Sequence, residues 1–428
     1  MPRTLDEWLR HIESLHPRGE AGIELGLERV RRVKEALGQR EVCPVITVGG
    51  TNGKGSTVAY LERILCNAGY RVGAYTSPHL LRYNERVRVA GVPVDDDALV
   101  AAFARVEAAR GQESLSYFEF GTLASWDVFA AAECDVIVLE IGLGGRLDAV
   151  NVYEPDIAIV TGIALDHTDW LGPTREEIGF EKAGIFRAGK PAFCADPEPP
   201  QSLVEHAEQI CADLRLIGRD FGYFGDRTQW SFWTRAGLRR GGLAPPSLRG
   251  RQQLGNAAVA LAALDALKEK LPVDMAAIRR GLIETELPGR FQVLPGRPVV
   301  VLDVAHNPQA AAALAANLDD MGFFDHTWVV AGMLADKDRT ATLASLRGKA
   351  DGWFFTDLPG PRGLGAESLR EALFEIEERA FPHTELHSTP ENAFAAASKG
   401  AGENDRILVF GSFLTVAAVL RFLKTKEC

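Results

Sequence analysis

The sequence predicts an α/β protein of two domains, each with a mostly parallel sheet covered by helices. Three observations lead to this fold class. The chain has 428 residues, more than the roughly 250 to 300 at which one hydrophobic core usually divides. Short apolar runs rich in Val and Ile alternate with stretches of helical periodicity. A glycine-rich turn follows the first of these runs.

The first domain opens with strand-like runs that are separated by helical stretches. These runs lie at residues 45–48, 72–75, 136–139 and 157–161. The stretch after the first run, 56–68, has apolar residues at helical spacing. Apolar strands joined by helices are typical of a parallel sheet that is buried on both faces.

Residues 221–249 have a different character, because aromatic side chains are interleaved there with Gly and Arg. This pattern predicts β-hairpins added to the first domain. Helices are expected next, at 256–267 and 275–285.

Pro and Gly then interrupt the chain at 287–290 and 295–298. We therefore place the domain boundary near residue 296, which gives domains 1–296 and 297–428. The second domain has strand-like runs at 299–302, 327–331, 352–356 and 406–410. Helices between them, including the alanine-rich 310–316, predict a smaller, open, Rossmann-like α/β domain.

The composition excludes several classes of function. Lys and Arg number 47 against 58 Asp and Glu, a net charge of −11, which argues against a general nucleic-acid or anionic-membrane surface. The amino terminus lacks the continuous apolar stretch of a signal peptide, and no later stretch is long enough to span a bilayer. We expect a cytoplasmic protein.

The loop after the first strand, residues 48–57, reads V-G-G-T-N-G-K-G-S-T. Its four glycines allow the backbone to approach a phosphate closely and to turn several N–H groups toward it. Lys54 adds a fixed positive charge. Strand, loop and helix occur in the order of a P-loop, so the first domain is predicted to be a P-loop ATPase domain that binds a polyphosphate.

The spacing within this loop departs from that of an ordinary P-loop. Gly50 precedes Gly53 by only three positions, and Gly55 separates Lys54 from Ser56. A standard P-loop has four residues between its glycines and places Ser or Thr directly after Lys. The spacing therefore disfavours a generic GTPase or kinase.

Three further strand ends carry potential metal ligands. Ser77 follows the second strand, Glu140 ends the third, and His167 follows the fourth. Ligands bind at the carboxyl ends of strands in open α/β sheets. Glu140 occupies the position of a Mg²⁺ ligand, whereas a histidine is unusual for Mg²⁺ and implies a second, more protein-bound metal position.

Other candidate residues lie outside these strand ends. Lys182 ends a helix, where a lysine is most often only a favourable charge. In the second domain, Asp303 and His306 lie between a strand and a helix, suited to contact a ribose or a catalytic phosphate. Asn256 can recognise an adenine edge, and Arg290 can neutralise a phosphate during transfer.

Taken together, the motifs resemble folylpolyglutamate synthases, and more closely the bacterial bifunctional dihydrofolate synthase/folylpolyglutamate synthases. The ordered set is GTNGKGS, TSPHL with YNERV, YFEFGT, LEIGLGGRLDAVN, LDHTDWLG, EKAGI, PGRFQ and DVAHNP. It covers nearly the whole chain, and the GTNGK core is also similar to that of the Mur ligases.

The resemblance implies an ATP-dependent amide ligase. ATP would phosphorylate the carboxylate of a pterin substrate, and the amine of L-glutamate would attack the resulting acyl phosphate. The implied small molecules are 7,8-dihydropteroate, tetrahydrofolates, L-glutamate, ATP and Mg²⁺ at two sites. No nucleic-acid or membrane partner is implied, and a monomer is expected.

The resemblance also implies which residues form the site. ATP would be bound by Thr51, Asn52, Gly53, Lys54, Gly55, Ser56, Asn256, Arg290 and Asp303. The magnesium ligands would be Ser77, Glu140, His167 and Lys182. Lys182 matches the family's carbamylated lysine, an interpretation that replaces the helix-end one, and Lys54, Lys182 and His306 are the candidate catalytic residues. Carbamylation needs a neutral amine. An ordinary lysine has a pKa of about 10.4 and is almost entirely charged at neutral pH, so burial must lower the pKa of Lys182.

Three segments match the dihydropteroate site of the family. They comprise Ile23, Glu24, Leu25, Ser116, Tyr117, Phe118, Glu119, Leu147, Asp148 and Ala149. Their presence favours bifunctionality over chain extension alone. One departure is Gly250-Arg251-Gln252-Gln253, which replaces the H-Q pair common in many relatives, so no role is carried over for that histidine.

Three alternatives stay open at this point. A Mur-type ligase is disfavoured because the chain starts almost directly with the ATPase domain. A P-loop phosphotransferase fits the motif spacing poorly. A non-catalytic binding module is disfavoured because no motif of the site is degraded.

Overall fold

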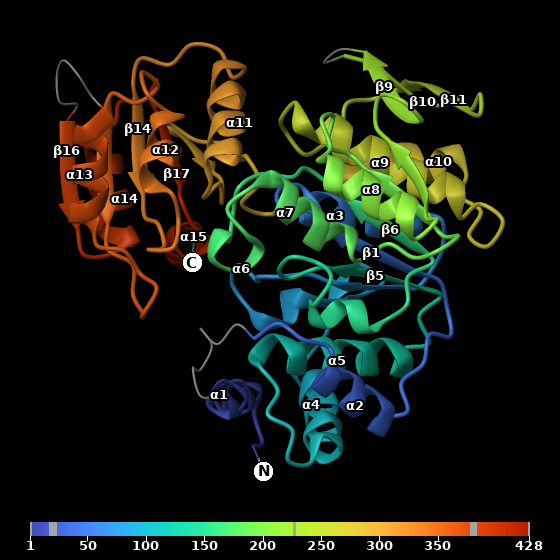
Figure 1. The fold of residues 1–428 in the computed structure, drawn as a ribbon. Helices are drawn as coiled ribbons and strands as arrows, with labels where there is room; N and C mark the ends of the chain where they lie inside the picture. Colours follow the sequence, from blue (N-terminus) through green and yellow to red (C-terminus); the bar gives the residue numbers. More distant parts are fainter. Residues whose placement is uncertain (1, 17–23, 226–227, 377–382, 427–428) are drawn as a thin grey trace. The chain divides into compact units, whose positions relative to one another are not determined.

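The computed structural model describes residues 2–16, 24–225, 228–376 and 383–426, and these divide into two compact units (Figure 1). The first unit consists of Met1–Ser247 and Gln253–Thr285, and the second of Leu248–Gln252 and Glu286–Cys428.

The first unit is built on an eight-stranded sheet with the order β4-β3-β2-β5-β1-β6-β7-β8. Its strands are β1 (Val45–Gly49), β2 (Val72–Tyr75), β3 (Val87–Val89), β4 (Val92–Pro93), β5 (Val136–Glu140), β6 (Ile157–Val160), β7 (Pro191–Cys194) and β8 (Asp213–Leu216). The strands from β2 to β8 in this order are parallel, whereas β3 and β4 form an antiparallel edge. Every residue of β1 and β5 is buried, as expected for central strands covered on both faces.

Helices cover both faces of this sheet (Figure 1). The helix α3 contacts β1, β2 and β5, and it packs against α10, while α5 contacts β2 and packs against α4. The helices of this unit are α1 (Leu5–Leu15), α2 (Glu28–Ala36), α3 (Lys54–Asn67), α4 (Asp96–Arg110), α5 (Tyr117–Ala131), α6 (Thr168–Leu171), α7 (Arg175–Ala183), α8 (Gln201–Gln209), α9 (Gln252–Ala266) and α10 (Met275–Glu284), with the short turns η2 (Tyr83–Arg86) and η3 (Ala149–Val152).

A separate three-stranded antiparallel sheet follows α8 in the chain. It consists of β9 (Phe221–Gly225), β10 (Trp230–Thr234) and β11 (Arg239–Leu243). Phe221, Trp230, Phe232 and Leu243 are buried in it. The prediction of β-hairpins in 221–249 is therefore confirmed.

The second unit has one six-stranded sheet with the order β12-β13-β17-β14-β15-β16. Its strands are β12 (Gln292–Leu294), β13 (Val299–Leu302), β14 (Thr327–Ala331), β15 (Gly352–Thr356), β16 (His383–His387) and β17 (Arg406–Phe410). Its helices are α11 (Pro308–Asp319), α12 (Arg339–Ala344), α13 (Ala366–Ile376), α14 (Pro390–Gly400) and α15 (Phe413–Lys426). All strands except β12 pair in parallel.

The predicted strands of both units are confirmed, to within one residue at each end. The short strands at the sheet edges have no counterpart in the predictions, because they lack long apolar runs. The units divide between Thr285 and Glu286, earlier than the boundary placed near 296. The reason is β12, which pairs antiparallel with β13 and so extends the sheet of the second unit.

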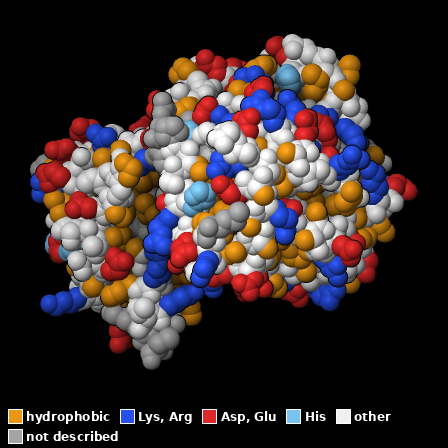
Figure 2. Space-filling view, turned by 90° about the horizontal axis from the view of Figure 1, so that it is seen from below, with side chains coloured by type: hydrophobic (Ala, Val, Ile, Leu, Met, Phe, Trp, Pro, Cys, Tyr) orange, Lys and Arg blue, Asp and Glu red, His pale blue; other side chains and the backbone are white. Residues whose placement is uncertain are grey.

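Charged side chains of both signs are spread over the face drawn in Figure 2, with hydrophobic atoms between them. No helix in the described part of the chain is long and apolar enough to cross a membrane.

Candidate functional site

The predicted motifs of the first unit meet at one edge of its sheet. The strands β2, β5, β1 and β6 are consecutive neighbours and run parallel. Their carboxyl ends therefore present Ser77, Glu140, the loop 50–53 and His167 in that order. Sequence reasoning placed each motif at a strand end, and the sheet order brings the four ends side by side.

Two glycines of the phosphate loop have backbone conformations that exclude other residues. Gly50 has φ of +135° and Gly53 has φ of +95°, in the region that favours glycine. A Cβ on Gly50 would lie 1.9 Å from Oγ1 of Thr161, and one on Gly53 would lie 2.6 Å from Oδ1 of Asn256. The loop thus packs closely against the end of β6 and against α9.

Hydrogen bonds fix the loop to the segment after β6. The Thr51 backbone N–H donates to the carbonyl of Gly162 over 2.7 Å, and the Ala164 N–H donates to Oγ1 of Thr51 over 3.1 Å. The Thr161 hydroxyl donates to the carbonyl of Asn52 over 2.7 Å. These bonds fix the shape of the loop.

Lys54 begins α3 and folds back over the loop. Its Nζ donates to the carbonyls of Gly50 and Thr51 over 3.0 and 3.2 Å. The ammonium is thereby held beside the amino end of α3, where unpaired N–H groups favour an anion. This geometry suits a polyphosphate.

Asn256, predicted to contact the nucleotide, is joined to the phosphate loop through Gln253. The Gln253 side chain donates to the Ser56 hydroxyl over 3.4 Å and accepts from Nδ2 of Asn256 over 3.0 Å. All three residues are buried. Gln253 was not predicted as a site residue, although it belongs to the Gly250-Arg251-Gln252-Gln253 segment that departs from the family pattern.

Ser77 and Glu140 lie next to each other, as the pairing of β2 with β5 requires. The Ser77 backbone N–H donates to Oε2 of Glu140 over 3.2 Å, and Glu140 is only 4% exposed. The Arg88 guanidinium is close enough for the charge of Glu140 to act on it. Arg88 is itself paired with Glu62 at 2.7 Å, a buried pair that sequence reasoning missed.

The loop containing Ser77 is shaped by Glu85 of the YNERV motif. Its carboxylate accepts the backbone N–H groups of Leu80, Leu81 and Arg82 over 2.7, 2.9 and 2.9 Å. Arg88 adds a bond from Nη1 to the Thr76 hydroxyl over 3.1 Å. This motif therefore organises the loop that carries a predicted metal ligand.

His167 has a left-handed backbone with φ of +53°, a conformation that costs energy and often marks a functional position. Its backbone N–H donates to Oδ1 of Asp166 over 2.9 Å, and its Nε2 lies 3.9 Å from the same oxygen. Asp166 is a second acidic group of the site that was not predicted, although it belongs to the LDHTDWLG motif.

Lys182 is almost completely buried, with 3% of its surface exposed. No hydrogen bond or ion pair joins its Nζ to any residue that the structure describes. Burial and, after it, the positive charge of Lys54 together lower its pKa to about 7, against the opposing charges of Asp166 and Asp148. These interactions place Lys54, Lys182, Asp148 and Asp166 in one electrostatic cluster.

The side chains at this edge fit a divalent cation. Glu140 supplies a buried carboxylate and Ser77 a hydroxyl, which are oxygen ligands that Mg²⁺ prefers, and His167 supplies an imidazole. Within the described ranges, no three His, Cys, Asp or Glu side chains converge as a metal site. Of the predicted ligands, only Glu140 and His167 are of these residue types. The proposed metal site therefore also needs the Ser77 hydroxyl and an oxygen ligand at Lys182.

Asp148 closes the glycine-rich turn after β5. Its carboxylate accepts the N–H groups of Leu143 and Val150 over 2.8 and 3.0 Å. Burial raises its pKa to about 7 despite these bonds. A buried carboxyl that titrates near neutrality can bind the polar edge of a heterocycle.

Two other predicted substrate segments lie beside this turn. The Gly26 N–H donates to the carbonyl of Leu147 over 3.2 Å, which brings residues 24–26 next to the turn, while Ile23 lies outside the described residues. The Phe118 ring would overlap a Cβ on Gly142, at 2.5 Å, and its centroid lies 5.8 Å from that of Tyr75.

Ser116 and Glu119 have structural partners of their own. They form a capping box at the start of α5, and the Glu119 carboxylate accepts Nε of Arg29 over 2.8 Å. Glu24 pairs with the same Arg29. These carboxylates therefore fix α5 and the segment before α2 relative to each other. Tyr117 packs edge-on against Tyr83 with centroids 5.8 Å apart.

The predicted residues of the second unit form their own cluster at the end of β13. The Asp303 carboxylate accepts the N–H groups of Phe291 and Ala305 over 2.8 and 2.7 Å, and burial raises its pKa against the charge of Arg290. The Nδ1 of His306 lies 2.8 Å from the carbonyl of Val304.

Arg290 and His306 share an aromatic neighbour at the start of α15. The Arg290 guanidinium lies 4.9 Å from the centroid of the Phe413 ring, and the His306 ring centroid lies 6.5 Å from it. Phe413 was not predicted, because an aromatic residue after a strand is more often part of a core.

Two family models match segments of the two units. A family model of the Mur ligase middle domain matches residues 48–195, and one of the Mur ligase glutamate ligase domain matches residues 289–413. The dihydrofolate synthase/folylpolyglutamate synthase of Escherichia coli (strain K12) is 45% identical over 99% of this chain and 96% of the relative. Its namesake from Haemophilus influenzae is 40% identical over 96% of each.

Solved structures are equally similar. E. coli FolC in complex with DHPP and ADP has a TM-score of 0.93 and 44% identity over 100% of both chains. A bifunctional folylpolyglutamate synthase/dihydrofolate synthase with Mn, AMPPNP and L-glutamate bound has a TM-score of 0.89 and 43% identity over 99% of this chain and 98% of that one. The chain belongs to the dihydrofolate synthase/folylpolyglutamate synthase family, which shares its middle and glutamate ligase domains with the Mur ligases.

Proposed function

We propose that the protein is an ATP-dependent amide ligase that adds L-glutamate to dihydropteroate, forming dihydrofolate, and to reduced folates, forming folylpolyglutamates. One observation carries this proposal. A glycine-rich phosphate loop, three potential metal ligands and a buried, electrostatically perturbed lysine lie at one edge of the first unit's sheet. A phosphotransferase needs the first two features and has no use for the third.

The first chemical step activates a carboxylate, which is a poor electrophile by itself. A carboxylate oxygen of the substrate attacks the γ-phosphorus of ATP, the bond to the β-phosphate oxygen breaks, and ADP leaves. Lys54 and the N–H groups at the start of α3 offset the charge on the phosphates during this transfer. Ser77, Glu140 and His167 would hold a divalent cation, which supplies further positive charge to the phosphates when bound.

In the second step, the amine of L-glutamate attacks the carbonyl carbon of the acyl phosphate, and phosphate leaves with the electrons of the broken C–O bond. The amine must lose a proton as the amide forms. We assign His306 to this region of the reaction, with Arg290 and Asp303 at the nucleotide. A hydrogen bond from Nδ1 of His306 to Val304 favours the neutral tautomer in which Nε2 accepts.

Lys182 is proposed to act as a carbamate. A neutral lysine amine adds to CO₂ and releases one proton, which gives a carboxylate-like oxygen ligand suited to a hard metal ion. The burial of Lys182 and its pKa of about 7 support this role, because a large share of the amine is then neutral at physiological pH.

The dihydropteroate site is assigned to the turn around Asp148 with Leu147 and Ala149, to the start of α5, and to the segment 23–25. The buried carboxyl of Asp148 and the ring of Phe118 offer a polar and a flat contact for a pterin. Ser116 and Glu119 would position this site through the capping box and the pair with Arg29.

A ligase of this kind releases ADP in a glutamate-dependent manner. Purified protein with ATP, Mg²⁺ and dihydropteroate should release ADP continuously only when L-glutamate is added, because the acyl phosphate otherwise has no acceptor. Equal ATP hydrolysis with and without L-glutamate would contradict a ligase. A monomeric state, a cytoplasmic location and the lack of a nucleic-acid partner stay predictions of the sequence.

A further inference from the structure

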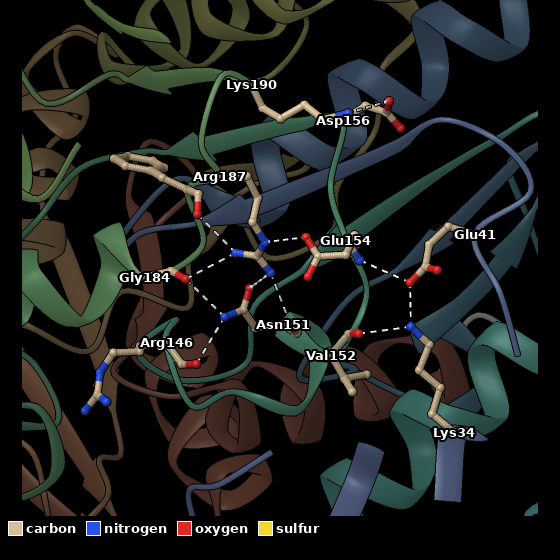
Figure 3. Close-up of polar contacts among 11 residues, drawn as sticks. Lys34, Glu41, Arg146, Asn151, Val152, Glu154, Asp156, Gly184, Arg187 and Lys190 are labelled. Atoms are coloured by element: carbon tan, nitrogen blue, oxygen red, sulfur yellow. Dashed lines mark hydrogen bonds and ion pairs between the residues drawn. The ribbon is translucent and has the colours of Figure 1, made fainter. Parts of the chain in front are cut away.

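Asn151 is a buried polar residue next to the proposed dihydropteroate turn. It lies in η3, which begins directly after Asp148, and only 6% of its surface is exposed. Figure 3 shows its side chain at the centre of a polar network that also contains Arg146, Gly184 and Arg187. A buried amide is costly unless its hydrogen bonds are made, so the partners of this side chain indicate what it holds in place.

The two N–H groups of the Asn151 amide join two separate segments. Its Nδ2 donates to the carbonyl of Arg146 over 3.0 Å and to that of Gly184 over 3.1 Å. Arg146 belongs to the turn that Asp148 closes, and Gly184 directly follows α7, two residues after Lys182. One side chain therefore holds the proposed dihydropteroate turn against the end of the helix that carries Lys182.

These segments are in close contact along their length. The Arg146 N–H donates to the carbonyl of Glu181 over 2.8 Å. A Cβ on Gly145 would lie 2.7 Å from that same carbonyl oxygen, and one on Gly184 would lie 2.4 Å from Cβ of Arg146. Because the two segments are so closely packed, a shift of the turn must move the end of α7 as well.

Arg187 completes the network from the other side. Its Nη2 donates to Oδ1 of Asn151 over 3.0 Å, and its Nε donates to Oε2 of Glu154 over 2.6 Å. The Asn151 amide thus uses both donors and its acceptor. Glu154 is mostly exposed, at 67% of its side chain, so its pair with Arg187 contributes little by itself.

We propose that Asn151 is a positioning residue that couples the dihydropteroate turn to Lys182. It fixes where Asp148 holds the substrate relative to the group that Lys182 supplies to the reaction. This inference rests on the proposed function, because the distance between the dihydropteroate turn and Lys182 matters only if both take part in the same reaction. It assigns no contact between Asn151 and any substrate.

The test uses the full-length enzyme and two variants of different character. Asn151→Asp keeps the shape and the bond from Arg187 but loses the donated bonds, and Asn151→Ser loses the whole amide. Glu154→Gln weakens only the exposed end of the network and serves as one control. Leu243→Ala, in the separate three-stranded sheet, is a second control that lowers stability away from these segments.

Both Asn151 variants should lower kcat and raise KM for dihydropteroate, each by about tenfold, with KM for ATP changed by less than about twofold. Glu154→Gln should resemble wild type. Leu243→Ala should keep wild-type kinetics when each protein is assayed at the same number of degrees below its own melting temperature. If Leu243→Ala loses as much activity as the Asn151 variants, the effect is one of stability and the proposal is overturned.

A double-mutant cycle tests the coupling itself. Once Asp148→Ala has removed the substrate contact, losing Asn151 should matter less, so the combined loss should be smaller than the product of the two single losses. Multiplicative losses would overturn the inference. If wild type forms no glutamate-dependent product, the proposed function fails, which is a result distinct from either outcome.

Discussion

Lys54 and Lys182 belong to the same electrostatic cluster, yet their surroundings are opposite. The Lys54 ammonium donates to the carbonyls of Gly50 and Thr51, beside the start of α3. Lys182 is buried at the end of α7 without a hydrogen bond to any described residue, and its pKa is lowered to about 7. Carbonyl oxygens stabilise a charged amine, whereas burial without partners destabilises it.

The difference matches the two roles that we propose for the two lysines. The ammonium of Lys54, held at the phosphate loop, suits the phosphates of ATP. Lys182 is poised to lose its proton, which is the condition for reacting with CO₂. The positive charge of Lys54 contributes to the lowered pKa of Lys182, so the two regions are also coupled. Substitutions at each lysine and at their neighbours test this contrast.

The largest effect is expected from Lys182→Ala. Loss of the proposed carbamate should reduce ligation at least about 10³-fold with both acceptors, while the circular dichroism spectrum remains that of wild type. Acetate, which can supply a carboxylate to the space left by the side chain, should restore part of the activity. Wild-type-like turnover would show that Lys182 has no role in catalysis.

Lys54→Met should lower kcat about 10² to 10³-fold, because it removes the charge that we propose to stabilise the transferred phosphate. Acetate should not rescue this variant, since the missing group is a cation. The exposed Lys268 provides a matched control, and Lys268→Met should turn over like wild type. Rescue of Lys54→Met by acetate would contradict the proposal that Lys54 acts as a cation and Lys182 as a carboxylate-like group.

Asp148→Ala should act on the acceptor rather than on ATP. Removing the buried carboxyl that we propose to bind the substrate should raise KM for dihydropteroate about 10 to 100-fold, with KM for ATP within about twofold of wild type. Steady-state kinetics with each substrate varied in turn will show this. An equal loss of affinity for both substrates would count against the assignment of the turn.

The smallest effect concerns stability and pH. The pKa of Lys182 is about 7 in the folded state, against an ordinary value of 10.5. Between pH 7 and pH 10.5 the amine is therefore protonated in the unfolded chain and mostly neutral in the folded one. Stability should therefore rise with pH in this window, by about 1 kcal/mol between pH 7 and 8. Urea unfolding of metal-free protein in CO₂-free buffer measures this gain, and Lys182→Met should lack it. An identical pH dependence in both proteins would show that Lys182 is not perturbed.

Local sequence was sufficient for the phosphate loop and for most of the sheet strands. Gly50, Gly53 and Lys54 lie within a few residues of each other, and their roles follow from backbone geometry that a short motif specifies. The apolar runs that form central strands are equally local signals. The edge strands escaped prediction because short, half-exposed segments have no such periodicity.

The environment of Lys182 could not be derived in this way. Its local pattern indicates only a charge at a helix end, and the family resemblance alone pointed to another role. The end of α7 that carries it packs against the turn after β5, which is distant in sequence. Asp166 and Asn151 were overlooked for the same reason, since their partners are defined only once the segments meet.

The most direct test of bifunctional amide ligation is mass spectrometry of the products formed from dihydropteroate and from tetrahydrofolate, each with ATP, Mg²⁺ and L-glutamate. Both acceptors should gain glutamyl residues, and no adduct should form without ATP. Glutamylation of neither acceptor would contradict the assignment of the site to amide ligation, and glutamylation of only one would contradict bifunctionality.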